Sequence, residues 1–462
     1  MTTEKINSEE ITTLLKLNED HFNDFKSNRI KPSKLQETFV SFANADGGEI
    51  YVGIEDKKVS TNRVIGFLEQ ESANDIISVL LEETSPSVEN VQIEFLKTEK
   101  DGLILKINIP KSPKVHYTSN GDCFIRINAL SKKIKGERIT TLAYSKGAEL
   151  YEKKIVEGAE FQDIIDSGII QKYQKRINSK QELFKFARKQ RLLSKKDNNY
   201  FPNVSCVLLF DDEPQAILQS RSAVKVYRLR TTNKEYKREH LQEMPKTING
   251  PLEDVIHKTI KQVGLYLADA SFQVGEKLVK LEYPTEALKE VLVNAVIHRD
   301  YSLNDDIHIK IFDNRIEILS PGKLPGYMSI DNLYEERFSR NPNVVRMLHN
   351  LPNPVNHDIG EGLDTVKNEL KKAGLIAPIF KESDNYFIVT IKHQKIASIE
   401  DIVIKYLNKN PTVELSNKLV RQLSGEDDMQ KVKKSLQKLR KNNVIKIKDT
   451  NASAFDYRYI KF

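Results

Sequence analysis

The sequence contains no tryptophan and only two cysteines, Cys123 and Cys206, among its 462 residues. Each cysteine stands alone in a strand-like run without the spacing of a zinc site, so we expect both to be buried apolar residues. Long apolar runs are also missing, and no stretch approaches the roughly 18 residues that a membrane-crossing helix needs. The amino terminus, MTTEKINSEE, has neither the basic nor the apolar section of a signal peptide. We therefore expect a cytoplasmic protein with no membrane partner.

Several catalytic signatures are absent as well. The sequence has no Walker A, HExxH or GxSxG motif, no internal repeat and no low-complexity tract. With 39% hydrophobic and 30% charged residues the composition is that of a globular protein, and the length suggests about three domains. The net charge of +7 favours a polyanionic partner only weakly until the charge is located on one surface.

The stretch PTEALKEVLVNAVIHRDYS, residues 284–302, carries the densest set of well-placed polar residues. Apolar residues recur at helical spacing, and Glu290 and Asn294 lie four apart, which makes them neighbours on one face of the predicted helix. The carboxylate can accept a proton from water, and the amide oxygen can bind a hard cation such as Mg²⁺. The ordinary alternative is that the two side chains hydrogen-bond each other or solvent.

The residues that follow extend this pattern. Two strand-like runs, 307–312 and 315–319, end in a Pro-Gly turn at 320–325. Further on, Gly360 and Gly362 precede a predicted helix at 364–373. Paired glycines at this position let backbone N–H groups approach an anion at the helix amino terminus.

In this order the pieces resemble the GHKL ATPases, the group that includes gyrase, Hsp-type chaperones, histidine kinases and mismatch-repair ATPases. The similarity covers roughly residues 270–395. More specifically, the sequence resembles the divergent branch whose proteins carry an NA-x-x-HRDY motif. It implies that Glu290 activates the attacking water, that Asn294 holds Mg²⁺ and that residues 326–358 form a lid over ATP. The implied nucleotide-binding positions are Asn294, His298, Asp300, Gly322, Gly360 and Gly362. The usual Asp-x-Gly-x-Gly box is reduced to Ser320-Pro321-Gly322, so the aspartate that would read adenine is missing.

The first part of the chain predicts a mixed α+β domain. Helices are expected at 8–17, from Ser33 and at 75–83, and the Gly47-Gly48 turn ends the second of these before a strand. Further strand-like runs occupy 91–95, 103–109 and 123–128.

The motifs Glu19-x4-Asp24-x-Lys26, Phe42-Ala-Asn-Ala-Asp-Gly47-Gly48 and Gly53-Ile-Glu-Asp56 resemble the Alba-like domain of Schlafen proteins. The resemblance implies nucleic-acid binding. It also implies a metal-dependent nuclease site formed by Glu19, Asp24 and Asp56 with Lys26 beside them, using Mg²⁺ or Mn²⁺. Asp24 stands where glutamate is more usual in that family. The alternative is that Asp24 and Lys26 form a solvated salt bridge on an edge strand and that Asp56 merely ends a strand.

Residues 149–268 are the least informative, and we interpret them as a connector domain. Strands are expected at 204–210 and 223–229, and a helix at 251–267. A basic stretch, 172–196, has the composition either of a phosphate-contacting face or of a solvated one.

The carboxyl-terminal residues predict three helices, at 399–407, 414–423 and 429–441, followed by strands at 444–448 and 455–460. This order suggests a winged helix. On the third helix a stripe of lysines opposite the apolar face is suited to follow a phosphate backbone, although winged helices also serve for dimerisation. The stripe consists of Lys431, Lys434, Lys438 and Lys441.

Together these patterns predict an α+β multidomain protein. Its expected domains are an Alba-like α/β domain (1–148), a connector (149–268), a GHKL-like α/β sandwich (269–395) and a winged helix (396–462). The predicted function is that of an ATP-regulated, Schlafen-like nuclease in bacterial anti-phage defence that acts on RNA or DNA as a homo-oligomer. The alternative is an ATP-responsive, DNA-binding transcriptional regulator.

Overall fold

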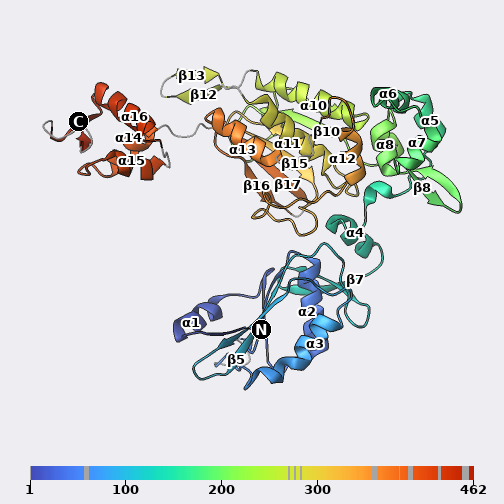
Figure 1. Ribbon diagram of the computed structural model, residues 1–462, viewed down its shortest axis with the longest axis horizontal. Helices are drawn as coiled ribbons and strands as arrows, with labels where there is room; N and C mark the ends of the chain where they lie inside the picture. The colour runs from blue at the N-terminus through green and yellow to red at the C-terminus, as the bar shows by residue number, and fades with distance from the viewer. Residues whose placement is uncertain are drawn as a thin grey trace. The chain divides into compact units, whose positions relative to one another are not determined.

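The structure is a computed structural model that shows a mixed α/β protein with several sheets (Figure 1). It divides into two compact units, which are described separately below. The first comprises residues 1–370 and 377–393, and the second comprises residues 371–376 and 394–462. The residues that the structure describes are 2–56, 62–268, 271–274, 277–280, 283–355, 362–383, 385–393, 399–424, 428–449 and 457–462.

The amino-terminal part of the first unit is built on a five-stranded sheet with the order β1-β4-β5-β3-β2. The pairs β1–β4 and β2–β3 are parallel, and the others are antiparallel. Leu35, Phe39 and Phe42 of α2 are fully buried in the core with residues of α3 and of the sheet, because apolar residues recur along one face of each helix. The elements are β1 (Thr2–Lys5), α1 (Ser8–Lys16), β2 (Asn23–Lys26), α2 (Pro32–Asn44), β3 (Gly48–Val52), α3 (Asn74–Glu82), β4 (Gln92–Lys97), β5 (Leu103–Ile109), the hairpin β6 (Cys123–Ile127) with β7 (Leu130–Ile134), and α4 (Glu137–Lys146).

A group of short helices follows, and one of them was wrongly predicted to be a strand. Residues 204–210, expected as a strand, form the buried helix α8, and Cys206 is therefore helical. The side chain of Asn203 caps this helix by accepting a hydrogen bond from Cys206 N at 3.1 Å. A short apolar run fits a buried strand as well as a buried helix, so the pattern alone could not decide. The elements are α5 (Phe161–Asp166), α6 (Ile169–Arg176), α7 (Leu183–Lys189), β8 (Leu193–Lys196), β9 (Asn199–Pro202), α8 (Val204–Phe210) and α9 (Pro214–Ile217).

The second large sheet has six strands in the order β11-β10-β14-β15-β17-β16. Strand β10 pairs in parallel with β14, with Val224 opposite Ile307, so the predicted boundary at 268 divides this sheet and needs correction. Helices α10 and α11 pack against each other and against its strands (Figure 1). The elements are β10 (Val224–Arg228), β11 (Lys246–Ile248), α10 (Leu252–Leu267), β12 (Ser271–Val274), β13 (Lys277–Lys280), α11 (Thr285–Ile297), β14 (Ile307–Ile311), β15 (Arg315–Pro321), α12 (Pro342–His349), α13 (Gly362–Lys372), β16 (Ile379–Glu382) and β17 (Tyr386–Lys392).

In its described residues, the second unit contains three helices and an antiparallel strand pair. Val432, Leu436 and Leu439 of α16 are buried in its core, as the sequence pattern predicted. Part of the second predicted strand, residues 455–456, lies outside the described residues, and the winged-helix assignment stays a prediction. No helix in the described ranges of either unit is long and apolar enough to span a bilayer. The elements are α14 (Ile399–Lys409), α15 (Asn417–Ser424), α16 (Met429–Lys441), β18 (Ile445–Ile447) and β19 (Tyr459–Lys461).

Candidate nucleotide pocket and nucleic-acid interface

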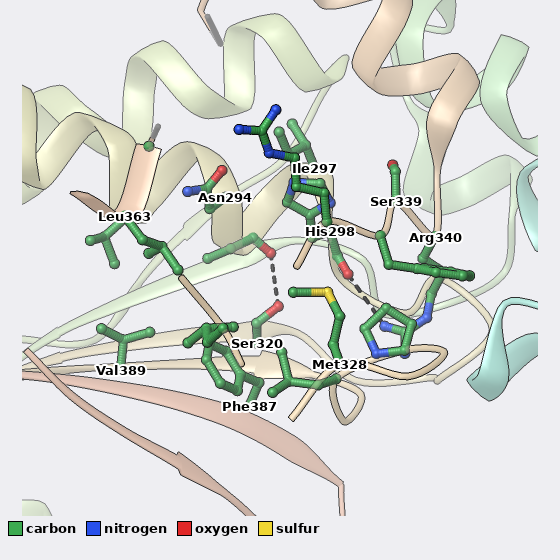
Figure 2. Close-up of a pocket in the computed structure, with 18 of the residues that line it drawn as sticks. Asn294, Ile297, His298, Ser320, Met328, Ser339, Arg340, Leu363, Phe387 and Val389 are labelled. Carbon is green, nitrogen blue, oxygen red and sulfur yellow. Dashed lines mark hydrogen bonds between the residues drawn. The ribbon is translucent and has the colours of Figure 1, made fainter. Parts of the chain in front are cut away.

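A cavity of about 440 Å³ lies between α11, strands β15 and β17, and the start of α13 (Figure 2). Its fourth wall is formed by residues 322–340, which we call the rim segment. A volume of this size suits a small-molecule ligand, and the apolar side chains among its walls would accept a flat, apolar surface such as a nucleobase. These apolar residues include Ile318, Met328, Leu333, Phe387 and Val389.

Helix α11 presents Glu290 and Asn294 to this cavity, because its apolar positions are buried in the core. Asn294 Nδ2 donates a hydrogen bond to Glu290 Oε1 at 2.9 Å, which is the contact that the ordinary alternative predicted. Since the amide nitrogen faces the carboxylate, the amide oxygen is the atom available to a cation. Activation of water by Glu290 and binding of Mg²⁺ by Asn294 stay predictions.

Gly362, the first residue of α13, touches the same carboxylate. A Cβ atom built at this glycine would lie 1.9 Å from Glu290 Oε1, so a larger residue here would require the Glu290 carboxylate to shift. The contact places the start of α13 beside Glu290, and Gly362 and Asn294 line the same cavity. Phosphate binding by Gly362 stays a prediction. Gly360, the other predicted glycine, lies outside the described residues.

His298 lines the cavity, whereas Asp300 is buried beneath Gly322. Asp300 Oδ1 accepts hydrogen bonds from the Ser302 backbone N–H at 2.9 Å and from its hydroxyl at 2.6 Å. Gly322 has φ +104°, and an added Cβ would lie 2.7 Å from Asp300 Cβ. These contacts shape the wall of the cavity. The role of Asp300 and Gly322 in binding nucleotide stays a prediction.

Arg340 is a residue of this site that sequence patterns missed. It is 2% exposed, and its Nη2 donates to Lys323 O at 2.7 Å while its Nη1 donates to His298 O at 3.3 Å. It therefore ties the two ends of the rim segment to the end of α11. A lone arginine in a polar loop gives no periodic signal, so only the packing reveals it.

The position of the missing aspartate is occupied by Ser320, which is 6% exposed. Its hydroxyl donates a hydrogen bond to Ala295 O of α11 at 2.8 Å (Figure 2). The serine thus fastens strand β15 to the helix.

In the amino-terminal domain, three of the four predicted residues meet at β2. Asp24 is 1% exposed and lies between Lys26 Nζ at 2.6 Å and Arg126 Nη2 at 3.2 Å, while Glu19 Oε1 lies 3.6 Å from Lys26 Nζ. The alternative of an Asp24–Lys26 salt bridge on an edge strand is confirmed for the pairing and for the strand, because β2 lies at the edge of the sheet. It is wrong about the solvation of Asp24, which Arg126 of the β6–β7 hairpin covers.

Asp56 is exposed where the chain leaves β3. Its neighbour Glu55 is buried and accepts hydrogen bonds from Ser27 Oγ at 2.6 Å and Arg29 Nη2 at 2.8 Å. Over the described ranges, no three His, Cys, Asp or Glu side chains are grouped so as to hold a metal ion. Metal binding by Glu19, Asp24 and Asp56 thus stays a prediction.

The lysine stripe of α16 is exposed, opposite the buried Val432, Leu436 and Leu439. Lys438 Nζ lies 3.3 Å from Glu400 Oε1, so part of its charge is balanced within the unit. Contact with nucleic acid by Lys431, Lys434, Lys438 and Lys441 remains a prediction.

The folds and the cavity define a multidomain α/β protein with a small-molecule site beside a separate α/β domain. Residues 19–135 match the family described as "Schlafen, AlbA_2", and residues 304–391 match that described as "Putative ATP-dependent DNA helicase recG C-terminal". Residues 19–135 are therefore Schlafen/AlbA-like, and residues 304–391 are similar to the carboxyl-terminal part of an ATP-dependent enzyme family. The second match begins after α11, so the roles of Glu290 and Asn294 rest on the residues themselves.

Among solved structures, the chain is similar to the DIP2311 protein from Corynebacterium diphtheriae, with 15% identity and a TM-score of 0.41. That similarity covers 98% of this chain and 96% of the other. No curated protein matches the chain significantly.

Proposed function

We propose that this protein binds ATP with Mg²⁺ in the cavity under α11 and uses nucleotide binding to regulate its action on nucleic acid. The observation that carries the proposal is the convergence of Glu290, Asn294 and the amino terminus of α13 at one cavity. The two family descriptions support it, because one names an ATP-dependent DNA enzyme and the other a Schlafen AlbA domain.

In this proposal the cavity divides into an apolar part for the base and a polar part for the phosphates. Lys323 and Arg337 line the wall and supply positive charge, and Asn294 binds Mg²⁺ through its amide oxygen. A carboxylate beside the cation site is suited to accept a proton from water, so Glu290 is the candidate general base for hydrolysis. The GHKL-type site predicted from the sequence shares with this proposal Glu290 as the residue that activates water and Asn294 as the Mg²⁺ ligand.

We assign nucleic-acid binding to the AlbA-like domain as the primary action. Two cations hold the carboxylate of Asp24, and this neutralisation favours a binding surface because a free carboxylate would repel phosphate. Cleavage by an ATP-regulated nuclease of anti-phage defence is the second candidate, and it is favoured by the convergence of Glu19, Asp24 and Lys26. A homo-oligomer and a DNA contact by the α16 lysines belong to the same proposal.

The test is to incubate the purified protein with total RNA, tRNA and plasmid, with Mg²⁺ or Mn²⁺, in the presence and absence of ATP. Binding is measured by mobility shift and cutting by gel. Retention of nucleic acid without cutting supports ATP-responsive binding. Cutting that is abolished by Asp56→Ala supports the nuclease. If nucleic acid is neither bound nor cut under any condition, the proposed function is wrong.

A further inference from the structure

The rim segment of the nucleotide cavity is fastened to the AlbA-like domain by a cluster of charged residues. Asp46, in the turn between α2 and β3, lies at its centre. Asp46 Oδ2 lies 2.9 Å from His21 Nε2 and 3.4 Å from Lys323 Nζ, and Oδ1 lies 3.5 Å from Lys111 Nζ. Three elements far apart in the sequence therefore meet at one carboxylate.

Asp46 remains ionised in this cluster. Burial acts to raise its pKa, but the hydrogen bond with His21 and the charges of Lys323 and Lys111 hold the pKa of this carboxyl well below its usual range. The carboxylate of Asp46 therefore stays charged toward Lys323 and Lys111 well into the acidic range.

The backbone of the rim segment is also held by the amino-terminal region. Lys111 Nζ donates to Leu324 O at 3.0 Å and to Met328 O at 3.1 Å. The Gly326 N–H donates to Lys146 O at 2.9 Å, and Arg340 Nη2 donates to Ser145 O at 3.0 Å. Both the beginning and the end of the segment are therefore anchored.

Packing reinforces the same junction through Gly147, which follows α4. This glycine has φ +73°, and a Cβ built there would lie 2.4 Å from the ring of Phe338. The ring of Phe338 thus sits directly on the backbone, and the rim segment has little room to shift without moving α4.

From Asp46 the contacts continue to the predicted nucleic-acid residues. His21 follows Asp20, whose carbonyl oxygen accepts a hydrogen bond from Arg126 Nη2 at 2.8 Å. The same guanidinium holds Asp24 at 3.2 Å. A short series of polar contacts therefore joins the cavity wall to the β2 site.

We infer that this junction couples the two sites, so that nucleotide in the cavity changes the affinity of the AlbA-like domain for nucleic acid through Lys323 and Asp46. The inference rests on the proposed function and adds the route of its regulation. Lys323 lines the cavity and also holds Asp46, so a nucleotide phosphate competes with Asp46 for the same ammonium group. By linkage, nucleic acid changes nucleotide affinity by the same factor.

The experiment measures this coupling factor directly with the full chain. The dissociation constant of a fluorescent single-stranded RNA or DNA is determined by anisotropy with and without saturating ATP and Mg²⁺, at fixed salt, and the ratio of the two is the factor. The variants are Asp46→Asn, which keeps the size of the side chain, and Lys111→Met, which removes the bonds to the rim carbonyls without altering the cavity lining. Glu37→Gln is the matched control, because Glu37 pairs with its helix neighbour Lys34 at 2.8 Å on α2.

We expect a factor of about five or more in the wild type and in Glu37→Gln, and a factor near one in Asp46→Asn and Lys111→Met. If the wild type binds both ligands with a factor of one, or if both junction variants keep the wild-type factor, the coupling route is wrong while the proposed function stands. Failure of the wild type to bind either ligand instead overturns the proposed function.

Discussion

Replacing Gly362 by alanine tests the geometry of the nucleotide site most sharply. The new Cβ would lie 1.9 Å from Glu290 Oε1 and 2.7 Å from Glu290 Cδ, so the carboxylate must move and give up its 2.9 Å hydrogen bond with Asn294. Losing such a bond costs about 0.5–1.5 kcal/mol. Replacing glycine by alanine in a helix adds up to about 1 kcal/mol to the free energy of unfolding, so the overall stability of the protein should change little.

Nucleotide affinity should fall, because Asn294 loses the partner that orients it. A loss of about 1 kcal/mol corresponds to a roughly fivefold weaker dissociation constant for ATP with Mg²⁺, measured by calorimetry. The control is Gly264→Ala in α10, where an added Cβ meets no atom within 4 Å, and it should leave ATP affinity unchanged.

A double-mutant cycle separates the clash from other effects. In a Glu290→Ala background, Gly362→Ala should cause no further loss of ATP affinity, because the carboxylate atoms that the new Cβ would contact are absent. Unchanged ATP affinity in Gly362→Ala, or simple additivity of the two substitutions, would refute the reasoning.

Three further predictions concern other parts of the chain. Lys434→Glu should weaken duplex DNA binding and reduce the slope of log affinity against log salt by about 1, whereas an identical slope would assign the second unit to assembly. Asp24→Ala should destabilise the first unit by about 3–5 kcal/mol, since the buried Arg126 loses the carboxylate that balances its charge and keeps only uncharged acceptors such as Asp20 O. The exposed Asp56→Ala should change stability by less than about 0.5 kcal/mol, and equal effects in calorimetry would contradict the assigned burial. Burial lowers the pKa of Lys146 from 10.5 to about 7, so above pH 7 the folded protein binds fewer protons than the unfolded chain. The melting temperature of the wild type should therefore rise with pH between about 7 and 10, and it should rise less in Lys146→Met.

Local patterns predicted much of the first domain and the nucleotide region. Helix α11, strand β5 and helix α16 follow the residues expected of them, because each has a strong apolar period bounded by polar or turn residues. The six-stranded sheet was harder to predict. Strand β10 pairs with β14 across about 80 intervening residues, and a local sequence pattern cannot indicate such a distant pairing.

The candidate site was predictable only in part, for a similar reason. Spacing on one helix placed Glu290 beside Asn294, and a glycine before a helix marked Gly362. The contacts of Arg126 with Asp24 and of Asp46 with Lys323 join residues that are 102 and 277 positions apart, and they depend on how separate elements pack. Packing of Arg126 against Asp24 is what buries a salt bridge that the sequence placed in solvent.

The most direct test of the whole account is the calorimetric titration of ATP with and without Mg²⁺ into the wild type and into Asn294→Ala and Glu290→Ala. We predict Mg²⁺-dependent binding in the wild type and its loss in Asn294→Ala, because Asn294 holds the cation. Glu290→Ala should keep Mg²⁺-dependent binding at roughly fivefold weaker affinity, because Asn294 loses its hydrogen-bond partner, and should lose hydrolysis, because Glu290 acts on water. Binding in Asn294→Ala that equals the wild type in both affinity and Mg²⁺ dependence would contradict the assignment of this cavity as the nucleotide site.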